Sequence, residues 1–526
     1  MIDKISMTPF SNRMDLCIIG GGITGAGLAL DAARRGLKVA LHEQFDFGFG
    51  ASTATSKLAH GGLRYLENRQ FSLVKESLNE RNFLLKKAKH LVKPLQFYVP
   101  LYKHSKWKPW KLKAGLTIYD WMQTQRILPT HRMINQPSVS AAVPWLNTAD
   151  MIGCGSYYDS QMEDHRLIME LLMMAHNEGA HIMNYSKVTN IESTNSGLGL
   201  DVRGDNAIVS TMNASSVVLA TGAWNNQFSN SGIVKPTKGI HLVLPDMDLG
   251  VALLLMTPQD QRVFFMMPWQ GRTLVGTTDQ TDDKLYDSPN VNANEVQYLL
   301  DAVNAYHTKK EWQIDHVEAV FVGYRPLIIT DEKKPSKQPR EESYIWLDNN
   351  VLAVSGGKYT TYRLMAERAL NMIQAKVFPD RILTKSGTGK VPFIGQMDSL
   401  DWPSDAQLNQ ISERYHIQRE SIVHIIETYG SLYKEILNTI SYQKEYAIRF
   451  DIGLPIVIAE LKYALSKEWV KTLDDFLLRR TYYGYLYKDN TEFLYKVAKQ
   501  FKQMTGSSQS EVDLLSKTLQ RVKINA

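Results

Sequence analysis

Residues 15–43 read DLCIIGGGITGAGLALDAARRGLKVALHE, and this stretch decides the fold. The apolar run 15–19 predicts a strand, and the Ala- and Leu-rich residues 23–35 predict a helix that Gly36 ends. Residues 38–42 predict a second strand. We therefore predict a βαβ unit at the start of a Rossmann-type α/β domain.

Three glycines, Gly20, Gly22 and Gly25, stand between the first strand and the helix in G-x-G-x-x-G spacing. Gly20 permits a tight turn, Gly22 lets the backbone approach a pyrophosphate, and Gly25 lets the helix pack closely on the strand. Glu43 ends the second strand about 20 residues further on, where a carboxylate can accept hydrogen bonds from ribose hydroxyls. The pattern predicts a dinucleotide site and does not separate NAD from FAD.

A second segment favours a flat cofactor. The apolar run 216–220 ends in Ala220, Thr221, Gly222, Ala223 and Trp224. A buried strand closed by such small residues lets another chain segment or a ring pass close to its backbone.

The composition sets the broad class. The chain has 526 residues, of which 44% are hydrophobic and 22% charged, enough for two or three domains with sizeable cores. A net charge of +6 without a dense basic cluster does not indicate nucleic-acid binding. Two cysteines, Cys17 and Cys154, provide no disulfide framework and suit a reducing compartment.

Neither a signal peptide nor a membrane-spanning segment is expected. Residues 1–13 are polar, and no uncharged apolar run reaches the roughly 18 residues that a spanning helix needs. We expect a cytoplasmic protein, or one that lies on the membrane from its cytoplasmic side.

The composition shifts near residue 391. From Trp402 onward glycine is sparse and helical patterns dominate, for example at 456–465 and 469–480. We predict a separate helical domain over residues 391–526.

Motifs along the rest of the chain resemble those of one flavoenzyme family. They are residues 56–67 (SKLAHGGLRYLE), 238–241 (KGIH), 268–269 (PW), 276–279 (GTTD), 323–327 (GYRPL), 356–363 (GGKYTTYR), 469–470 (WV) and 474–481 (DDFLLRRT). In this order they resemble the FAD-dependent glycerol-3-phosphate dehydrogenases, over residues 14 to 490. These motifs are far more specific than the glycine fingerprint.

This resemblance implies a Rossmann-type FAD-binding domain interleaved with a substrate domain built on an antiparallel sheet, followed by the helical domain. The expected boundaries are residues 14–90, 150–235 and 335–390 for the FAD-binding domain, and 91–149 and 236–334 for the substrate domain. One departure is residues 337–342 (KQPREE), a variant of the family's Ser/Thr-Arg-Asp type segment, in which Arg340 is expected to hold the equivalent place.

The resemblance also implies the cofactor, FAD, and the residues that contact it. The expected contacts are Gly20, Gly22, Gly25, Glu43, Ser52, Thr53, Ser56, Lys57, Val188, Ala220, Thr221, Gly222, Trp224, Gly357, Lys358 and Thr360.

The implied reaction is the oxidation of glycerol 3-phosphate to dihydroxyacetone phosphate. A hydride acceptor must face the C–H bond, a base must take the hydroxyl proton, and the phosphate must be fixed. By resemblance, Arg64 and Arg325 supply the guanidinium forks that pair with phosphate oxygens. Tyr65 and His60 are expected to line the same pocket.

Two residues compete for the role of base. The imidazole of His241 titrates near neutral pH, and its Lys-Gly-x-His setting singles it out among 13 histidines. Lys358 follows two glycines and could instead stabilise negative charge at the flavin or polarise the substrate oxygen. The sequence does not decide between them. No cluster has metal-ligand spacing, so no metal is predicted.

Electrons must leave the reduced flavin for a membrane quinone or for oxygen, and the resemblance favours the quinone. Residues 91–122 interleave lysines with aromatic residues, a composition that suits a membrane surface. They are Lys93, Lys103, Lys106, Lys108, Lys111 and Lys113, with Tyr98, Tyr102, Trp107, Trp110, Tyr119 and Trp121. A solvated loop with partly buried aromatic residues is the other interpretation.

Three rival functions stay open at this point. They are a glycerol-3-phosphate oxidase that reduces oxygen, a related flavoenzyme acting on an amino acid or another hydroxy acid, and a catalytically silent flavoprotein. The helical domain could cap the active site or form the surface of a homodimer.

Overall fold

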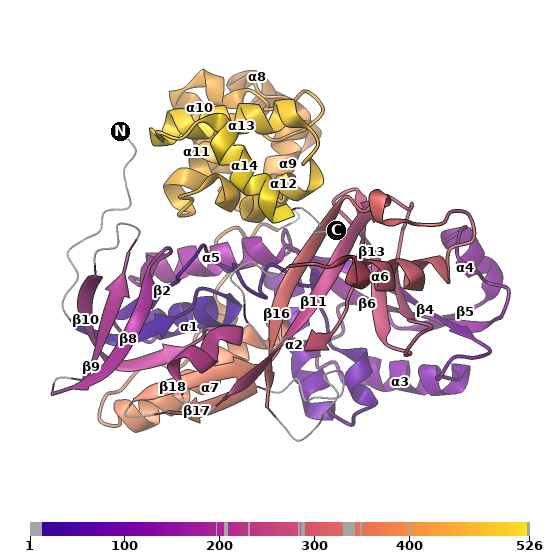
Figure 1. The fold of residues 1–526 in the computed structure, drawn as a ribbon, viewed down its shortest axis with the longest axis horizontal. Helices are drawn as coiled ribbons and strands as arrows, with labels where there is room; N and C mark the ends of the chain where they lie inside the picture. The colour runs from indigo at the N-terminus through magenta and orange to yellow at the C-terminus, as the bar shows by residue number, and fades with distance from the viewer. Residues whose placement is uncertain are drawn as a thin grey trace.

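The structure, a computed structural model, describes residues 13–522 except 196, 205–208, 230–231, 282–284, 286–289, 330–341, 348–349 and 399–400. Arg340 therefore lies outside the described residues. Figure 1 shows two sheet-containing regions side by side and a compact group of C-terminal helices above them.

The first sheet is built around β1 (Arg13–Ile19), which pairs in parallel with β2 (Val39–His42) and β10 (Val209–Leu219). Helix α1 (Ile23–Arg34) connects β1 to β2, so the predicted βαβ unit is confirmed. The strand order is β17-β18-β10-β1-β2-β7, with β9 paired to β10 and β8 paired to β9. The other strands are β7 (His181–Met183), β8 (Lys187–Thr194), β9 (Gly197–Arg203), β17 (Glu342–Trp346) and β18 (Val351–Gly356).

Side chains of β1 alternate between the two faces of this sheet. Leu16 and Ile18 pack among the helices α1, α5 (Asp164–Asn177) and α7 (Tyr362–Val377). Cys17 and Ile19 pack on the opposite face with residues of β8 and β9. Because both faces are covered, the strand reads as a continuous apolar run.

The second sheet is antiparallel except where β4 and β12 pair in parallel. Its strand order is β15-β11-β14-β13-β12-β4-β6-β3, with β16 beside β11 and β5 beside β6. The strands are β3 (Leu58–Ala59), β4 (Val92–Tyr102), β5 (Arg132–Ile134), β6 (Met151–Met162), β11 (Val234–Pro245), β12 (Ala252–Met256), β13 (Val263–Trp269), β14 (Arg272–Gly276), β15 (Gln280–Thr281) and β16 (Ala319–Ile328). The helices beside it are α2 (Phe71–Lys87), α3 (Pro109–Trp121), α4 (Gln136–Ala142) and α6 (Ala293–Asn304).

One predicted domain boundary differs from the structure. The boundary at residue 150 assigns β6 to the FAD-binding domain, yet β6 pairs along its length with β4 of the second sheet. The side chains of Cys154 and Tyr157 are buried in two clusters of that sheet, one on each of its faces. The partner of a strand is chosen by such tertiary burial, which the local pattern does not contain.

The C-terminal domain is helical, as predicted. Its helices are α8 (Asp405–Tyr415), α9 (Arg419–Tyr429), α10 (Tyr433–Tyr442), α11 (Ile458–Lys467), α12 (Tyr483–Leu486), α13 (Thr491–Thr505) and α14 (Glu511–Val522). The predicted helix at 469–480 is correct only in its second half, which ends in a π-helical turn, Asp475–Arg480. Asp475 accepts hydrogen bonds from the backbone N–H groups of Lys471 and Thr472, at 2.9 Å each, and so holds the chain in a turn before the helix. No helix in the described ranges combines the length and apolar character needed to cross a bilayer.

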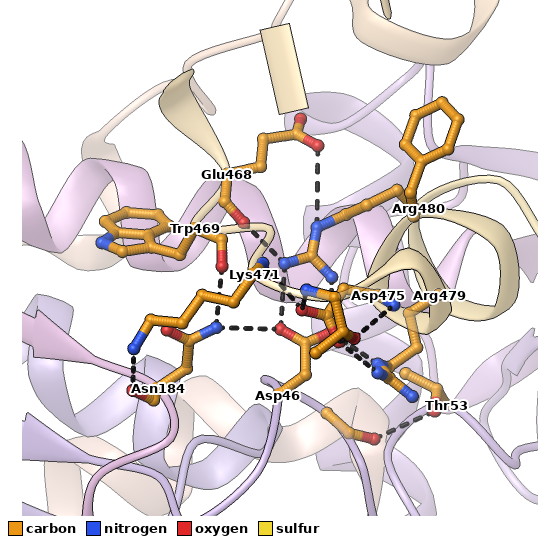
Figure 2. A network of polar contacts seen from close by, with 12 residues as sticks. Asp46, Thr53, Asn184, Glu468, Trp469, Lys471, Asp475, Arg479 and Arg480 are labelled. Atoms are coloured by element: carbon orange, nitrogen blue, oxygen red, sulfur yellow. Dashed lines mark hydrogen bonds and ion pairs between the residues drawn. The ribbon is translucent and has the colours of Figure 1, made fainter. Parts of the chain in front are cut away.

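A buried network of charges fastens the helical domain to the first sheet (Figure 2). The carboxylate of Asp46, just after β2, accepts hydrogen bonds from Arg480 at 2.6 and 3.0 Å and from Arg479 at 2.5 Å. Burial alone would raise the pKa of Asp46, but the two guanidinium groups hold it below its usual range. Asn184 donates to Asp46 and to the carbonyl of Trp469, which adds a second link between the domains.

Candidate active site

A cavity of about 330 Å³ lies along the carboxyl ends of β1, β2, β10 and β18 and extends to β11 and β16 of the second sheet. The carboxyl ends of parallel strands are where α/β sheets bind nucleotides. Its wall joins the glycine fingerprint beside the first sheet to His241 and Arg325 of the second sheet.

The part of the wall at the fingerprint has the features of a dinucleotide cradle. Gly20 has a φ of +109°, and a Cβ atom there would lie 2.5 Å from the carbonyl oxygen of Ala220. At the N-terminus of α1, Ser52 Oγ accepts a hydrogen bond from the backbone N–H of Ile23 at 3.1 Å. Glu43 accepts from the N–H of Gly21 at 2.7 Å. The glycines therefore leave room for a pyrophosphate at the N-terminus of α1, with the carboxylate of Glu43 nearby for a ribose, and the residues present fit FAD.

His241 forms part of the wall beside the second sheet. It lies on β11 and is 2% exposed, and its Nε2 lies 2.8 Å from Ser56 Oγ. Its Nδ1 has no hydrogen-bond partner among the described residues. Burial, with smaller effects from the charges of Arg325 and Lys57, lowers the pKa of His241 to about 3. The imidazole is therefore neutral at neutral pH and keeps a lone pair.

Arg325 lies on β16 next to His241 and is held in a fixed orientation. Its guanidinium donates to the carbonyl of Thr278 at 3.0 Å, to Asp279 Oδ1 at 3.1 Å and to Thr277 Oγ1 at 2.7 Å. Gly239 on the neighbouring strand makes room for it, since a Cβ atom there would lie 2.4 Å from Nη2. A guanidinium held in this way is preorganised for an anion.

Lys358, His60 and Tyr65 also line the cavity. The Lys358 ammonium lies 3.9 Å from the centre of the Tyr65 ring and donates to Ser77 Oγ at 2.9 Å. Burial lowers the pKa of His60 to about 4. A cation and two neutral imidazoles thus share one pocket with the Arg325 guanidinium.

Most of the predicted cofactor contacts lie in the cavity wall. These wall residues are Gly20, Gly22, Glu43, Ser52, Ser56, Val188, Ala220, Thr221, Gly222, Trp224, Gly357 and Lys358. Residues that the sequence analysis missed include Thr24, Phe45, Phe49, Tyr324, Ser355 and Tyr359. Several of these directly follow or precede predicted residues, but no pattern in the sequence distinguishes them from other residues near the motifs.

Five predicted site residues lie outside the wall. Gly25 serves helix packing, because a Cβ atom there would lie 1.9 Å from the carbonyl oxygen of Gly20. Thr53 donates to the carbonyl of Gly48, and the hydroxyl of Thr360 accepts a hydrogen bond from the N–H of His60. Arg64 lies beside the wall with its guanidinium 5.6 Å from the centre of the Tyr65 ring.

Lys57 is the clearest departure from the predicted set. Its side chain is fully buried and its ammonium pairs with Asp164 at 2.9 Å, away from the cavity. The pairing has a physical cause, since a buried ammonium needs a carboxylate to offset the loss of hydration. Within the described residues, His, Cys, Asp and Glu side chains form no group of three that could hold a metal ion.

Two family models together match most of the chain. A family described as FAD dependent oxidoreductase matches residues 15–363, and one described as C-terminal domain of alpha-glycerophosphate oxidase matches residues 386–512. The glycerol-3-phosphate dehydrogenase of Synechocystis is 32% identical over 494 residues, covering 89% of this chain and 88% of the relative. The aerobic glycerol-3-phosphate dehydrogenase of Staphylococcus saprophyticus is 31% identical over 497 residues, covering 90% and 87%.

Two solved structures share the fold. That of the glycerol-3-phosphate dehydrogenase from Bacillus halodurans, complexed with FAD, gives a TM-score of 0.77 at 25% identity, covering 97% of this chain and 95% of that one. That of the L-alpha-glycerophosphate oxidase from Mycoplasma pneumoniae, with FAD bound, gives 0.56 at 15% identity, covering 71% and 97%.

Proposed function

The chain belongs to the FAD-dependent glycerol-3-phosphate dehydrogenase family, and we propose that it oxidises sn-glycerol 3-phosphate to dihydroxyacetone phosphate and passes the electrons to a membrane quinone. The family resemblance and the FAD cofactor predicted from the sequence are confirmed. The observation that carries the substrate is the placement of Arg325 beside the neutral imidazole of His241 in the cavity wall.

Each of these side chains matches one demand of the substrate. The fixed guanidinium of Arg325 supplies a fork for the phosphate, whose charge of nearly −2 calls for such a partner. The neutral imidazole of His241 accepts the proton of the secondary hydroxyl. When bound, FAD supplies the hydride acceptor. We assign His241 as the base from its place in the cavity wall with Arg325, and Lys358 as the cation that stabilises developing negative charge.

A surface on α3 supports the membrane part of the proposal. Trp110, Ala114, Ile118 and Trp121 recur at helical spacing on the exposed side of α3, where Trp110 is 73% and Trp121 81% exposed. On the opposite side, Leu112, Leu116 and Tyr119 are buried in the core. In Figure 1 α3 lies at the lower edge of the molecule, whereas the helical domain lies at the top.

The surroundings of this exposed side are basic. All six lysines between residues 93 and 113 are exposed, although Lys103, Lys106 and Lys111 make ion pairs at the surface. Of the aromatic residues predicted to face a membrane, Tyr102, Trp107 and Tyr119 are buried instead, and Tyr98 is half-buried. Exposed tryptophans flanked by lysines suit an anionic leaflet. We propose that α3 holds the protein on the cytoplasmic face of the cell membrane.

The first test is the visible spectrum of the purified protein under anaerobic conditions. We expect a yellow protein whose flavin absorbance bleaches with glycerol 3-phosphate and not with glycerol or an amino acid. A flavin that does not bleach would overturn the substrate. Because glycerol lacks the phosphate and has the same hydroxyls, it also tests the role assigned to Arg325.

The second test identifies the electron acceptor. The reduced protein is mixed with a short-chain quinone or with oxygenated buffer, and recovery of the flavin absorbance is timed. Faster recovery with quinone supports a dehydrogenase, whereas peroxide formation at full turnover identifies an oxidase. A homodimer stays a prediction, which analytical ultracentrifugation of the same preparation tests.

A further inference from the structure

Both neighbours of Ser56 in the chain are anchored on a single buried carboxylate. Thr55 donates to Asp164 Oδ2 at 2.7 Å, and the ammonium of Lys57 donates to both oxygens of Asp164 at 2.9 and 3.0 Å. Between these anchors, Ser56 Oγ lies 2.8 Å from Nε2 of His241. The position of the Ser56 hydroxyl is therefore fixed from both sides.

The helical domain completes this anchor. The hydroxyl of Tyr482 donates to Asp164 Oδ1 and accepts from the ammonium of Lys57 at 2.9 Å. The same ammonium lies 4.2 Å from the centre of the Tyr482 ring. Tyr482 also packs edge-on against Phe321, which is the cross-strand partner of His241. A residue more than 400 positions downstream thus supports the segment that holds His241.

The anchor contains a buried ion pair and two unfavourable backbone conformations, and packing alone does not explain why they are present. Lys57 and Asp164 are fully buried, and a buried ion pair adds little net stability because both charges lose their hydration. Lys57 and Tyr482 both have left-handed backbone conformations, with φ of +55° and +57°. Such strained residues cluster at functional sites, where the surrounding structure holds them. A polar network with its hydrogen bonds satisfied is rigid, which is the property that a positioning element needs.

We propose that Asp164, Lys57 and Tyr482 form a positioning unit that holds Ser56 against His241, and that the helical domain thereby orients the imidazole that accepts the proton. This inference rests on the proposed function. The Ser56 hydroxyl can donate to Nε2 or accept from it, and in either case the contact fixes the direction of the ring. None of the three anchoring residues lines the cavity, so they act through Ser56.

The experiment is a double-mutant cycle with Tyr482→Phe and Ser56→Ala in the full-length, FAD-loaded protein. The rate constant of flavin reduction by glycerol 3-phosphate is measured by anaerobic stopped flow, together with the half-saturating substrate concentration, FAD content and Tm. We expect each single variant to reduce the flavin about 10-fold more slowly with little change in half-saturation. The double variant should be no slower than the slower single variant, because Tyr482 acts through Ser56.

Two controls accompany the cycle. Tyr483→Phe removes the hydroxyl of the next residue, which packs within the helical domain, and should leave the rate unchanged. Ser56→Thr keeps a hydroxyl and should recover most of the rate. The proposal would be overturned if the losses in rate constant of the two single variants multiply in the double variant. It would also be overturned if Tyr482→Phe lowers the Tm without changing the rate constant of flavin reduction.

A structural readout separates this proposal from the proposed function. Crystal structures of the parent and of Tyr482→Phe should show Ser56 Oγ leaving hydrogen-bond distance of His241 in the variant. An unchanged contact would refute the positioning unit even if the substrate is correct. A parent protein whose flavin glycerol 3-phosphate does not reduce would refute the substrate and leave the structural comparison valid.

Discussion

Gly276 lies directly against the imidazole of His241, so that a Cβ atom at Gly276 would fall 2.0 Å from Cδ2 of the ring. The two residues are cross-strand partners on β14 and β11. No real Cβ approaches a ring atom so closely, and therefore the position of His241 depends on the absence of a side chain on the neighbouring strand.

Gly276→Ala should displace His241 and slow flavin reduction by at least about 10-fold, since misplacing a catalytic group costs rate steeply. FAD content should stay near that of the parent, because the fingerprint lies beside the first sheet. Gly250→Ala is the matched control, since a Cβ atom there meets open space. A Gly276→Ala enzyme as fast as the parent would show that His241 is not the base.

Arg325→Ala should weaken substrate binding while leaving FAD bound. A hydrogen bond to a charged group is worth about 1.5–3 kcal/mol, which corresponds to a rise in KM of roughly 10- to 150-fold. Steady-state kinetics with glycerol 3-phosphate measure it. Arg325→Lys keeps the charge and loses the fork, so it should recover only part of the affinity. A parent-like KM for Arg325→Ala would place the phosphate elsewhere.

Asp46→Asn should destabilise the protein by up to about 3–5 kcal/mol, because it removes the buried carboxylate shared by Arg479 and Arg480, which are left with Asp475 and Glu468 as carboxylate partners. Thermal unfolding measures the loss, and FAD content should fall with it, since Asp46 follows closely after Glu43 in the cavity wall. Asp405→Asn removes one partner of an exposed ion pair with Arg419 and should change the Tm little. Equal effects of the two substitutions would contradict the importance of the buried network.

The stability of the protein should fall in mild acid partly through His42. Burial lowers the pKa of His42 to about 4, whereas an unfolded histidine titrates near 6.5. Between those values the unfolded chain binds a proton that the native state does not, so stability is present above pH 6.5 and is lost as the pH falls toward 4. The loss is about 1.4 kcal/mol per pH unit.

Comparison of the parent with His42→Gln isolates this contribution, because other titrating groups affect both proteins alike. Urea unfolding at several pH values between 4.5 and 6.5 gives the free energy of unfolding as a function of pH. The slope of this dependence should be shallower for the variant, by the amount that corresponds to about one proton. Parallel slopes would show that His42 takes up its proton in the native state too.

Replacing Trp110 and Trp121 together with serine should reduce sedimentation with anionic vesicles at least about 10-fold, since each exposed indole contributes interfacial binding. Turnover with a soluble short-chain quinone should not change, because neither residue lines the cavity. Trp402→Ser, at an exposed tryptophan outside α3, is the control. Undiminished vesicle binding by the double variant would exclude α3 as the membrane surface.

Local patterns predicted the first sheet well. The run around β1, the glycines after it and Glu43 after β2 are all short-range signals, and they specify a βαβ unit without help from the rest of the chain. The assignment of β6 failed because its partner, β4, is chosen by burial on both faces, which no local window contains. The predicted helix at 469–480 is wrong in its first half because Asp475 holds the chain in a turn there.

The reactive end of the cavity could be predicted only through family motifs, since one histidine among 13 has no distinguishing local pattern. The anchor behind it was not predictable. Lys57 lies among cavity residues in the sequence, and this position predicts that it contacts the cofactor. In the folded protein its ammonium instead binds Asp164 and Tyr482, away from the cavity. Such partners become visible only when the chain is folded.

The pairing of Asp46 with Arg479 joins residues 433 positions apart, and this spacing has a consequence for how the protein is made. A ribosome adds about 5–20 residues per second, so the carboxylate waits roughly 20–90 seconds for its arginines. During that interval the segment after β2 carries an unneutralised charge beside the nucleotide cradle. The anchor between the two domains therefore forms only after nearly the whole chain has been made, and a product that ends before Arg479 lacks it.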